Sequence, residues 1–438
     1  MKNVFKIRHL KLLAIAIPMV LSNIAAPLLG LVDTAIIGHL PDAIYLSAVA
    51  LGAMVVSFTY LLLVFLRMST TGLSADAFGA RDRAKLQQVW CDAILFALLL
   101  AAFIWLVKPL VLIATWQLVE ASPELQALTT QYIEIRYWSA PAALFMLVNL
   151  GVLLAIQRVK QAMILVVITN LLNVFGDIVL IIYLDMNVVG AAWASVIAEY
   201  VTATLGTWWV IRAIDLKFHD MPRFAPLRLR KLAYMNSDIF IRSVMLHFAM
   251  AMMTAWASYY GEVFIAANAV LLQFLMLISL GLDGIAYAAE ALVGRAKGRR
   301  SSQQIQLWTR LSLQWSVGLA LCYSLIFYVF GGAIIELITD IPEVIDTARN
   351  YLPWIVVLPL LAHWSYWFDG IFIGLSASKA MRNTMVFSTV VVFLPVWWFS
   401  QSLENHGLWL ALCCFMVARG VSQAYVTWRR SLLTVTTN

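Results

Sequence analysis

The amino-acid sequence predicts an all-α polytopic membrane protein with twelve transmembrane helices. Three observations lead to this prediction: 63% of the 438 residues are hydrophobic, only 12% are charged, and the basic residues fall in short clusters between long apolar runs. A soluble domain carries about 25% charged and roughly 45–50% apolar residues. The composition therefore excludes a soluble enzyme and a secreted module. The net charge of +7 does not indicate nucleic-acid binding either, because its basic residues form no single patch.

Apolar stretches long enough to cross a bilayer define the predicted helices. A hydrocarbon core of about 30 Å requires roughly 20 helical residues at 1.5 Å each. The first stretch follows a basic start, but it is too long for a signal peptide and contains Asp33, so we interpret it as a span. The twelve predicted spans are residues 11–38, 44–73, 89–113, 127–157, 161–184, 188–213, 231–259, 263–294, 307–333, 345–376, 381–401 and 407–430.

The basic residues predict the orientation of these spans. Most of the 30 lysines and arginines fall in alternate loops, and only Lys108 and Arg349 fall in the loops of the other side. Loops rich in lysine and arginine stay in the cytoplasm. We therefore expect both termini to be cytoplasmic.

The chain resembles itself when it is shifted by 219 residues, half of its length. The shift pairs Gly79 with Gly298, Arg81 with Arg300, Tyr132 with Tyr351, Gly151 with Gly370, Lys160 with Lys379 and Trp209 with Trp428. One constant shift indicates a duplication, and six spans per copy give both copies the same orientation. We therefore expect two six-helix bundles, residues 1–213 and 231–438, joined by a cytoplasmic linker at 214–230. Such repeats are related by a pseudo-two-fold axis along the membrane normal.

Four segments are distinctive enough to compare with known families: residues 27–40 (PLLGLVDTAIIGHL), 65–79 (FLRMSTTGLSADAFG), 170–180 (NLLNVFGDIVL) and 188–199 (VVGAAWASVIAE). The first resembles the first helix of the MATE family of multidrug and toxin extrusion transporters. The second is similar to the DinF-like branch, and the last two resemble the fifth and sixth helices of the family. The resemblance covers essentially the whole chain. It implies a monomeric secondary exporter of amphiphilic, often cationic, organic compounds in a bacterial inner membrane.

Polar residues inside the predicted spans are the candidate site. A charged side chain at the bilayer centre costs about 2.5–3.5 kcal/mol, which makes intramembrane acids functional candidates. Asp33, Asp177 and Ser195 lie at similar depths, roughly 8–11 Å below the outer surface. Asn173 lies one helical turn before Asp177, on the same face. We predict that these four residues couple transport to a cation.

The coupling ion is expected to be H⁺, with Na⁺ as the alternative. Burial favours the protonated form of an aspartate, but sodium would use the same oxygens. The alternative is that these polar groups are structural and only form hydrogen bonds between helices. The repeat favours the functional interpretation, because packing residues should be kept in both halves. It relates Asp33 to Met252, Asn173 to Val392, Asp177 to Val396 and Ser195 to Cys414.

Other residues have secondary roles in this prediction. Asp369 in span 10 is a second candidate acid, since relatives in the NorM-like branch are thought to bind the coupling ion in that half. Pro18 and Pro27 interrupt the helix that carries Asp33, either as a static bend or as a hinge. The intramembrane arginines that we expect to pair with acids of the second half are Arg67, Arg136, Arg242 and Arg419.

Other functions remain as alternatives. A lipid or lipid-linked-sugar flippase would share the fold. An intramembrane protease is disfavoured, because the segment ending at Asp177 lacks the first glycine of a GxGD motif and HExxH is absent. We expect no enzyme activity, no cofactor and no bound metal. The expected partners are small amphiphilic substrates and membrane lipids.

Overall fold

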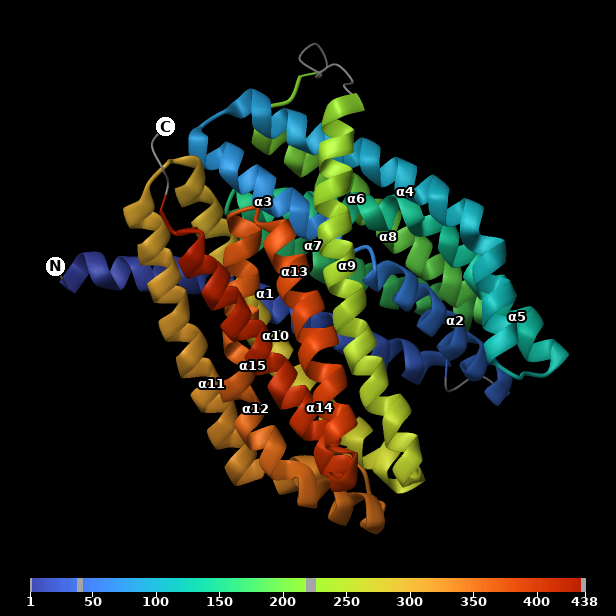
Figure 1. Cartoon of the computed structure of the whole chain (residues 1–438). Coiled ribbons are helices and arrows are strands. Elements are labelled where there is room, and N and C mark those ends of the chain that lie inside the picture. Colours follow the sequence, from blue (N-terminus) through green and yellow to red (C-terminus); the bar gives the residue numbers. More distant parts are fainter. Residues whose placement is uncertain (1, 38–41, 218–225, 435–438) are drawn as a thin grey trace. The chain divides into compact units, whose positions relative to one another are not determined.

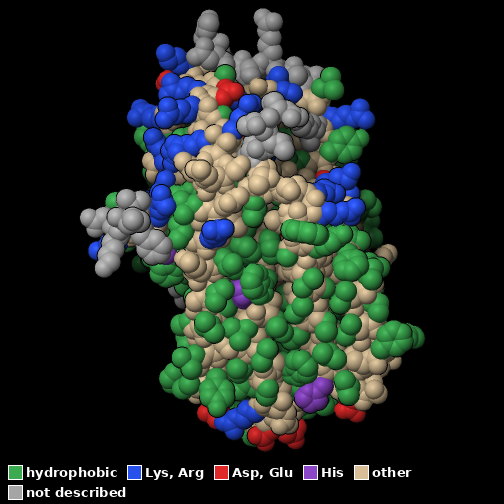
Figure 2. All heavy atoms as spheres, turned by 60° about the vertical axis from the view of Figure 1, so that its left-hand side comes forward, with side chains coloured by type: hydrophobic (Ala, Val, Ile, Leu, Met, Phe, Trp, Pro, Cys, Tyr) green, Lys and Arg blue, Asp and Glu red, His purple; other side chains and the backbone are tan. Residues whose placement is uncertain are grey.

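A computed structural model describes residues 2–37, 42–217 and 226–434, with the side chains of 2–5, 26–35, 43, 226 and 231 outside the described set. Within these ranges the chain is nearly all helical. Twelve of its helical segments are long and apolar enough to cross a membrane, which confirms the predicted fold class. In the view of Figure 2, hydrophobic side chains cover a broad belt, and lysines and arginines gather toward one end.

The first half of the chain contains α1 to α8. Their bounds are α1 (Lys2–Ile37), α2 (Ala43–Leu61), α3 (Phe65–Ala80), α4 (Arg83–Leu118), α5 (Pro123–Arg136), α6 (Ala140–Ala155), α7 (Val159–Asp177) and α8 (Asn187–Ile214). A 3₁₀ turn at Tyr137–Ser139 joins α5 to α6, and a π-helix, η2 (Ile178–Tyr183), extends α7. The predicted second span is thus two helices, α2 and α3.

The second half contains α9 to α15. Their bounds are α9 (Pro226–Ala257), α10 (Glu262–Gly298), α11 (Ser302–Ile338), α12 (Pro342–Gly374), α13 (Ser378–Phe387), α14 (Leu394–Phe399) and α15 (Asn405–Arg429). A π-helix, η5 (Ser388–Phe393), links α13 to α14. Helix α12 packs against α10, α11 and α15, and these helices lie together in Figure 1.

The helices form two compact units. One consists of residues 21–78 and 82–233, and the other of residues 1–20, 79–81 and 234–438. The first part of α1 therefore packs with the second half of the chain. In that unit, a Cβ added to Gly284 of α10 would overlap the side chain of Val20 of α1.

The duplication is visible in the local backbone. Among the described residues, six of the nine non-glycine residues with positive φ form pairs separated by 219 positions: Arg81 and Arg300, Gln157 and Ser376, Asp185 and Glu404. Helices α4 and α11 begin at equivalent N-caps, Asp82 and Ser301. The Asp82 side chain accepts a hydrogen bond from the backbone amide of Lys85, and the Ser301 side chain accepts one from that of Gln304. Such caps satisfy amide groups that the first helical turn leaves open. The two halves therefore turn and restart their helices at equivalent positions.

Equivalent helices also approach each other at equivalent glycines. A Cβ on Gly151 in α6 would lie 2.8 Å from the carbonyl oxygen of Arg67 in α3. The same atom on Gly370 in α12 would overlap the carbonyl oxygen of Ala286 in α10. Both members of each contact are related by the 219-residue shift. Small residues let backbones in a membrane pack closely, so both halves keep this particular glycine contact.

Candidate functional site

The predicted polar site of the first half is built on the contact between α7 and α8. The side-chain amide of Asn173 donates a hydrogen bond to the Ser195 hydroxyl over 3.0 Å. Asn173 is buried, with 3% of its surface exposed, and Ser195 is half-buried. The structure therefore brings together two of the four predicted residues, which lie 22 positions apart in the chain and on different helices.

Asp177 lies at the last position of α7, one turn beyond Asn173, and is 1% exposed. The neighbouring Gly176 lets α7 approach α8 closely at this level. A Cβ on Gly176 would be 2.9 Å from the Cβ of Ala194, the residue before Ser195. The π-helix η2 begins directly after Asp177. π-Helical turns are often found at functional sites, and this one changes the helix at its buried acid.

Helix α1 contacts the same face of α7. The amide of Asn170 donates a hydrogen bond to the carbonyl oxygen of Ala25 over 3.1 Å. Asp33 lies farther along the same continuous helix, but its side chain and that of Pro27 lie outside the described residues. Pro18 is half-buried within α1. The contact of Asp33 with Asn173 and Asp177 thus stays a prediction.

The sequence interpretation missed a largely buried ion pair in this half. Arg136 in α5 donates to the Glu199 carboxylate over 2.9 Å, and to the Ser139 hydroxyl over 3.0 Å. The Tyr60 hydroxyl lies 3.2 Å from that of Ser139. The expectation that Arg136 pairs with an acid of the second half was therefore wrong. Glu199 could have been found, because it follows Ser195 by one turn of α8 and continues the same polar face.

In the second half, Asp369 is surrounded by donors. One of its oxygens, Oδ2, accepts hydrogen bonds from Arg242 at 2.5 Å and from Arg419 at 2.9 Å. Its other oxygen, Oδ1, accepts from the Gln423 amide at 2.8 Å. These residues come from α9, α12 and α15, and all four are buried. The prediction that Arg242 and Arg419 pair with acids of this half is confirmed.

The charges of Arg242, Arg419 and Asp369 do not balance by themselves. Two guanidinium groups face one carboxylate, so the three side chains together carry one positive charge. Arg419 is 1% exposed, and its guanidinium also lies 5.5 Å from the ring of Phe415 and 6.0 Å from that of Tyr366. Such ring faces stabilise a cation by about 0.5–2 kcal/mol. Asp369 is thus already held by built-in cations.

Comparison with known proteins identifies the family of this chain. The family model described as MatE matches residues 18–179 and 239–399, once in each half. This chain belongs to the MATE family of multidrug and toxic compound efflux transporters. The chain is 41% identical over 425 residues to the DNA damage-inducible protein F of Escherichia coli K12, covering 95% of this chain and 91% of that protein. This likeness confirms the DinF-like resemblance.

More distant relatives and solved structures agree with the MATE assignment. The chain is 23% identical over 437 residues to the multidrug export protein MepA of Staphylococcus aureus, covering 97% of this chain and 94% of that protein. A MOP superfamily transporter from Pyrococcus furiosus has the same fold, with a TM-score of 0.86 and 21% identity, covering 97% and 96% of the two chains. These relatives are transporters.

The two halves of this MATE transporter differ at the candidate site. The positions equivalent to Asn173 and Ser195 are Val392 and Cys414, which line an apolar groove in the second half. The acid of the second half, Asp369, lies at a different position and is paired with arginines. The duplication therefore kept the backbone and changed the chemistry of each half.

Proposed function

We propose that this MATE transporter is a cation-coupled antiporter that exports amphiphilic, often cationic, organic compounds by alternating access, with H⁺ as the coupling ion. The observation that carries the proposal is the hydrogen bond between Asn173 and Ser195 beside the buried carboxyl group of Asp177. Polar groups at this depth are costly unless they have partners, which makes a polar cluster with an acid a candidate ion site. The proposed coupling residues are Asp33, Asn173, Asp177 and Ser195.

The register of α1 and α7 supports including Asp33. The hydrogen bond between Asn170 and Ala25 fixes the two helices at one level. Asp33 is eight residues beyond Ala25, or about 12 Å along the helix, and Asp177 is seven beyond Asn170, or about 10 Å. As odd-numbered spans, the two helices cross the membrane in the same direction. The backbones of Asp33 and Asp177 therefore reach similar levels.

This geometry supports an exchange between cation and substrate. An ionised carboxylate near Asn173 accepts hydrogen bonds and attracts an organic cation, whereas a protonated one carries no charge. Protonation from outside would therefore weaken the hold on a cationic substrate, and substrate binding from inside would favour loss of the proton. Such mutual exclusion is a negative coupling between two ligands of one site, and it is reciprocal. In this scheme Pro18 and Pro27 let α1 bend when Asp33 is neutralised.

The remaining features of the proposal follow from the duplication and the charges. Residues 1–213 and 231–438 act as the two lobes, and residues 214–230 link them on the cytoplasmic side. Both termini are cytoplasmic, in a bacterial inner membrane, and the protein acts as a monomer without a cofactor. Asp369 is the secondary candidate acid, but its two arginine partners favour a fixed carboxylate over one that exchanges ions.

The test uses the full chain in liposomes loaded with a fluorescent organic cation such as ethidium. A pH gradient and a sodium gradient are imposed separately. We expect uphill transport with the pH gradient alone, and at least a tenfold loss of rate in Asp33→Asn and in Asp177→Asn. Asp346→Asn, which alters an exposed acid in α12, is the matched control and should transport normally.

The alternatives are distinct outcomes of this experiment. Uphill transport with sodium alone would replace H⁺ by Na⁺ in the mechanism. Lipid movement between leaflets without transport of the organic cation would favour the flippase. Full coupled transport by both aspartate variants would exclude these acids from the ion path.

A further inference from the structure

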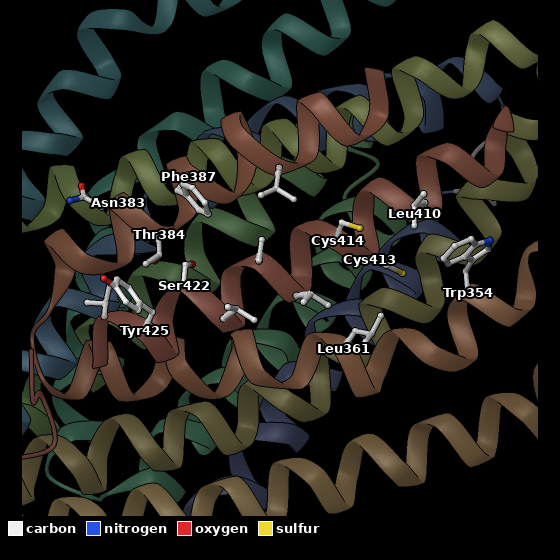
Figure 3. A pocket seen from close by; sticks show the side chains of 15 residues that line it. Trp354, Leu361, Asn383, Thr384, Phe387, Leu410, Cys413, Cys414, Ser422 and Tyr425 are labelled. Atoms are coloured by element: carbon white, nitrogen blue, oxygen red, sulfur yellow. The ribbon is translucent and has the colours of Figure 1, made fainter. Parts of the chain in front are cut away.

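A long apolar groove lies in the second half, between α12, α13 with η5, and α15. Its volume is about 940 Å³. Trp354 and Leu410 lie at one end, and Figure 3 shows Asn383, Thr384, Ser422 and Tyr425 toward the other. Between them the wall is formed by apolar side chains and the two neighbouring cysteines. The groove therefore has an almost wholly apolar lining, and its residues with polar side chains gather at one end, here called the polar end.

The groove is long enough to hold a lipid tail. Its lining on α15 runs from Leu410 to Val426, a rise of about 24 Å for sixteen residues. One tail occupies about half of a hydrocarbon core of about 30 Å. Val417 and Val421 are 39% and 62% exposed in the middle of this wall. An extended apolar chain would cover them along the axis of α15.

The polar end of the groove continues into positive charge. Lys379 precedes Asn383 by four residues on α13, and Arg429 follows Tyr425 by four on α15. Residues four apart share a helical face, so each basic residue extends one wall of the groove by a turn. Both are exposed, and among the described residues neither forms an ion pair. The neighbouring Arg382 differs, because it pairs with Asp238 over 2.6 Å.

We propose that this groove binds an anionic phospholipid of the surrounding membrane, with its head group at Lys379 and Arg429 and one acyl chain along α15 toward Trp354. The charge at one end and the apolar length of the groove together select this ligand. The site is the counterpart of the polar site in the first half, since Val392 and Cys414 replace Asn173 and Ser195. The duplication would then give one half an ion site and the other a lipid site.

The experiment follows the reaction of Cys414 with N-ethylmaleimide, because this thiol lines the groove. The full chain carries Cys91→Ala, Cys322→Ala and Cys413→Ala, so that Cys414 alone reacts. The purified protein in detergent is titrated with dioleoylphosphatidylglycerol or with dioleoylphosphatidylcholine, which has the same chains. We expect the anionic lipid to slow alkylation at much lower concentration.

Two variants locate the head group and the tail. Each basic residue near an anionic lipid strengthens binding about fivefold, so Lys379→Gln with Arg429→Gln should weaken protection about 25-fold. Arg299→Gln with Arg310→Gln removes two exposed charges elsewhere in this half and should leave protection unchanged. Val421→Trp fills the groove, and native mass spectrometry should then detect less bound phosphatidylglycerol than with Val329→Trp on an exposed face of α11.

Several results would overturn the proposal. Equal protection by the two lipids would show that the groove does not recognise the anionic head group. Unchanged protection in the Lys379 and Arg429 variant would show that the head group does not bind at these two residues. Protection by ethidium instead of lipid would make the groove a substrate site. Protection that depends on protein concentration alone would make it an interface between copies. The readout needs no transport, so its failure is distinguishable from failure of the proposed antiport.

Discussion

At the scale of single residues, the cluster around Asp369 shows how a membrane protein holds charge in its interior. Each partner removes part of the cost of burying the others, and the excess positive charge lies against aromatic rings. Removing one partner of a buried pair is strongly destabilising, because the other charge remains in an apolar setting. The effect of a substitution here therefore depends on the charge that it leaves behind.

This reasoning predicts an asymmetry between the acid and its partners. Asp369→Asn leaves two buried guanidinium groups without a carboxylate and should lower the free energy of unfolding by about 3–5 kcal/mol. Arg419→Gln leaves a neutral pair of Asp369 and Arg242 and should cost much less. Thermal unfolding of the purified protein in detergent measures both.

Arg83→Gln is the control for this asymmetry, because it breaks an exposed pair with Asp215 and should cost under about 1 kcal/mol. If Asp369→Asn were as stable as Arg419→Gln, the cluster would not be the charge-balancing unit described above. Loss of transport in a fully stable Asp369→Asn would instead favour the role of Asp369 as a coupling acid.

At the scale of elements, the paired glycines explain how each half keeps its helices close. A methyl group added at Gly370 would meet the backbone of Ala286, which cannot move without shifting α10. Overpacking of this kind costs about 1–3 kcal/mol. We expect Gly370→Ala to lower the unfolding temperature and Gly151→Ala to act in the same direction.

Gly318 in α11 provides the matched comparison. A Cβ there has no neighbour within 4 Å, so Gly318→Ala should be neutral or should stabilise the helix by up to about 1 kcal/mol. Unfolding temperatures of the three single variants test the idea. Equal effects of Gly370→Ala and Gly318→Ala would show that helix propensity, not close packing, decides the result.

Elements also show how far the sequence alone could predict this fold. Hydropathy predicted twelve spans, because burial in lipid needs a continuous apolar run, and the 219-residue shift predicted a duplication with six spans in each copy. The break between α2 and α3 and the π-helix after Asp177 were missed. Both features depend on which carbonyl oxygen accepts the hydrogen bond of each backbone amide. A hydropathy profile contains no information about that pattern.

The candidate site was predictable to a similar extent. Counting residues along each helix predicted equal depth for Asp33, Asp177 and Ser195, and helical periodicity added Asn173 one turn before Asp177. Of these four residues, Asn173 and Ser195 form a hydrogen bond in the structure. The pairing of Arg136 with Glu199 was missed, because it depends on how α5 and α8 are rotated about their axes. Rotation is set by packing contacts such as that of Gly176 with Ala194, which a single sequence does not display.

At the scale of the whole molecule, charge distribution determines how the chain is inserted. Lysines and arginines retained in the cytoplasm set the orientation of neighbouring spans. The linker around Lys217 and the loop before α12 around Glu343 belong to opposite sides in the predicted topology. Both residues are exposed, and α12 begins with Pro342 and Glu343 at its first turn. Thiols introduced at these two positions therefore report the orientation directly.

The prediction uses a full chain in which all four native cysteines are replaced by alanine. Lys217→Cys and Glu343→Cys are expressed separately in intact cells and treated with a membrane-impermeant maleimide. We expect labelling at position 343 before lysis, and at position 217 only after lysis. Labelling at position 217 from outside would reverse the orientation. It would also place the proposed ion site near the cytoplasmic face, since Asp177 and Ser195 lie toward the side opposite the linker. The lysines and arginines that set the orientation of the spans therefore also set the direction of the proposed coupled transport.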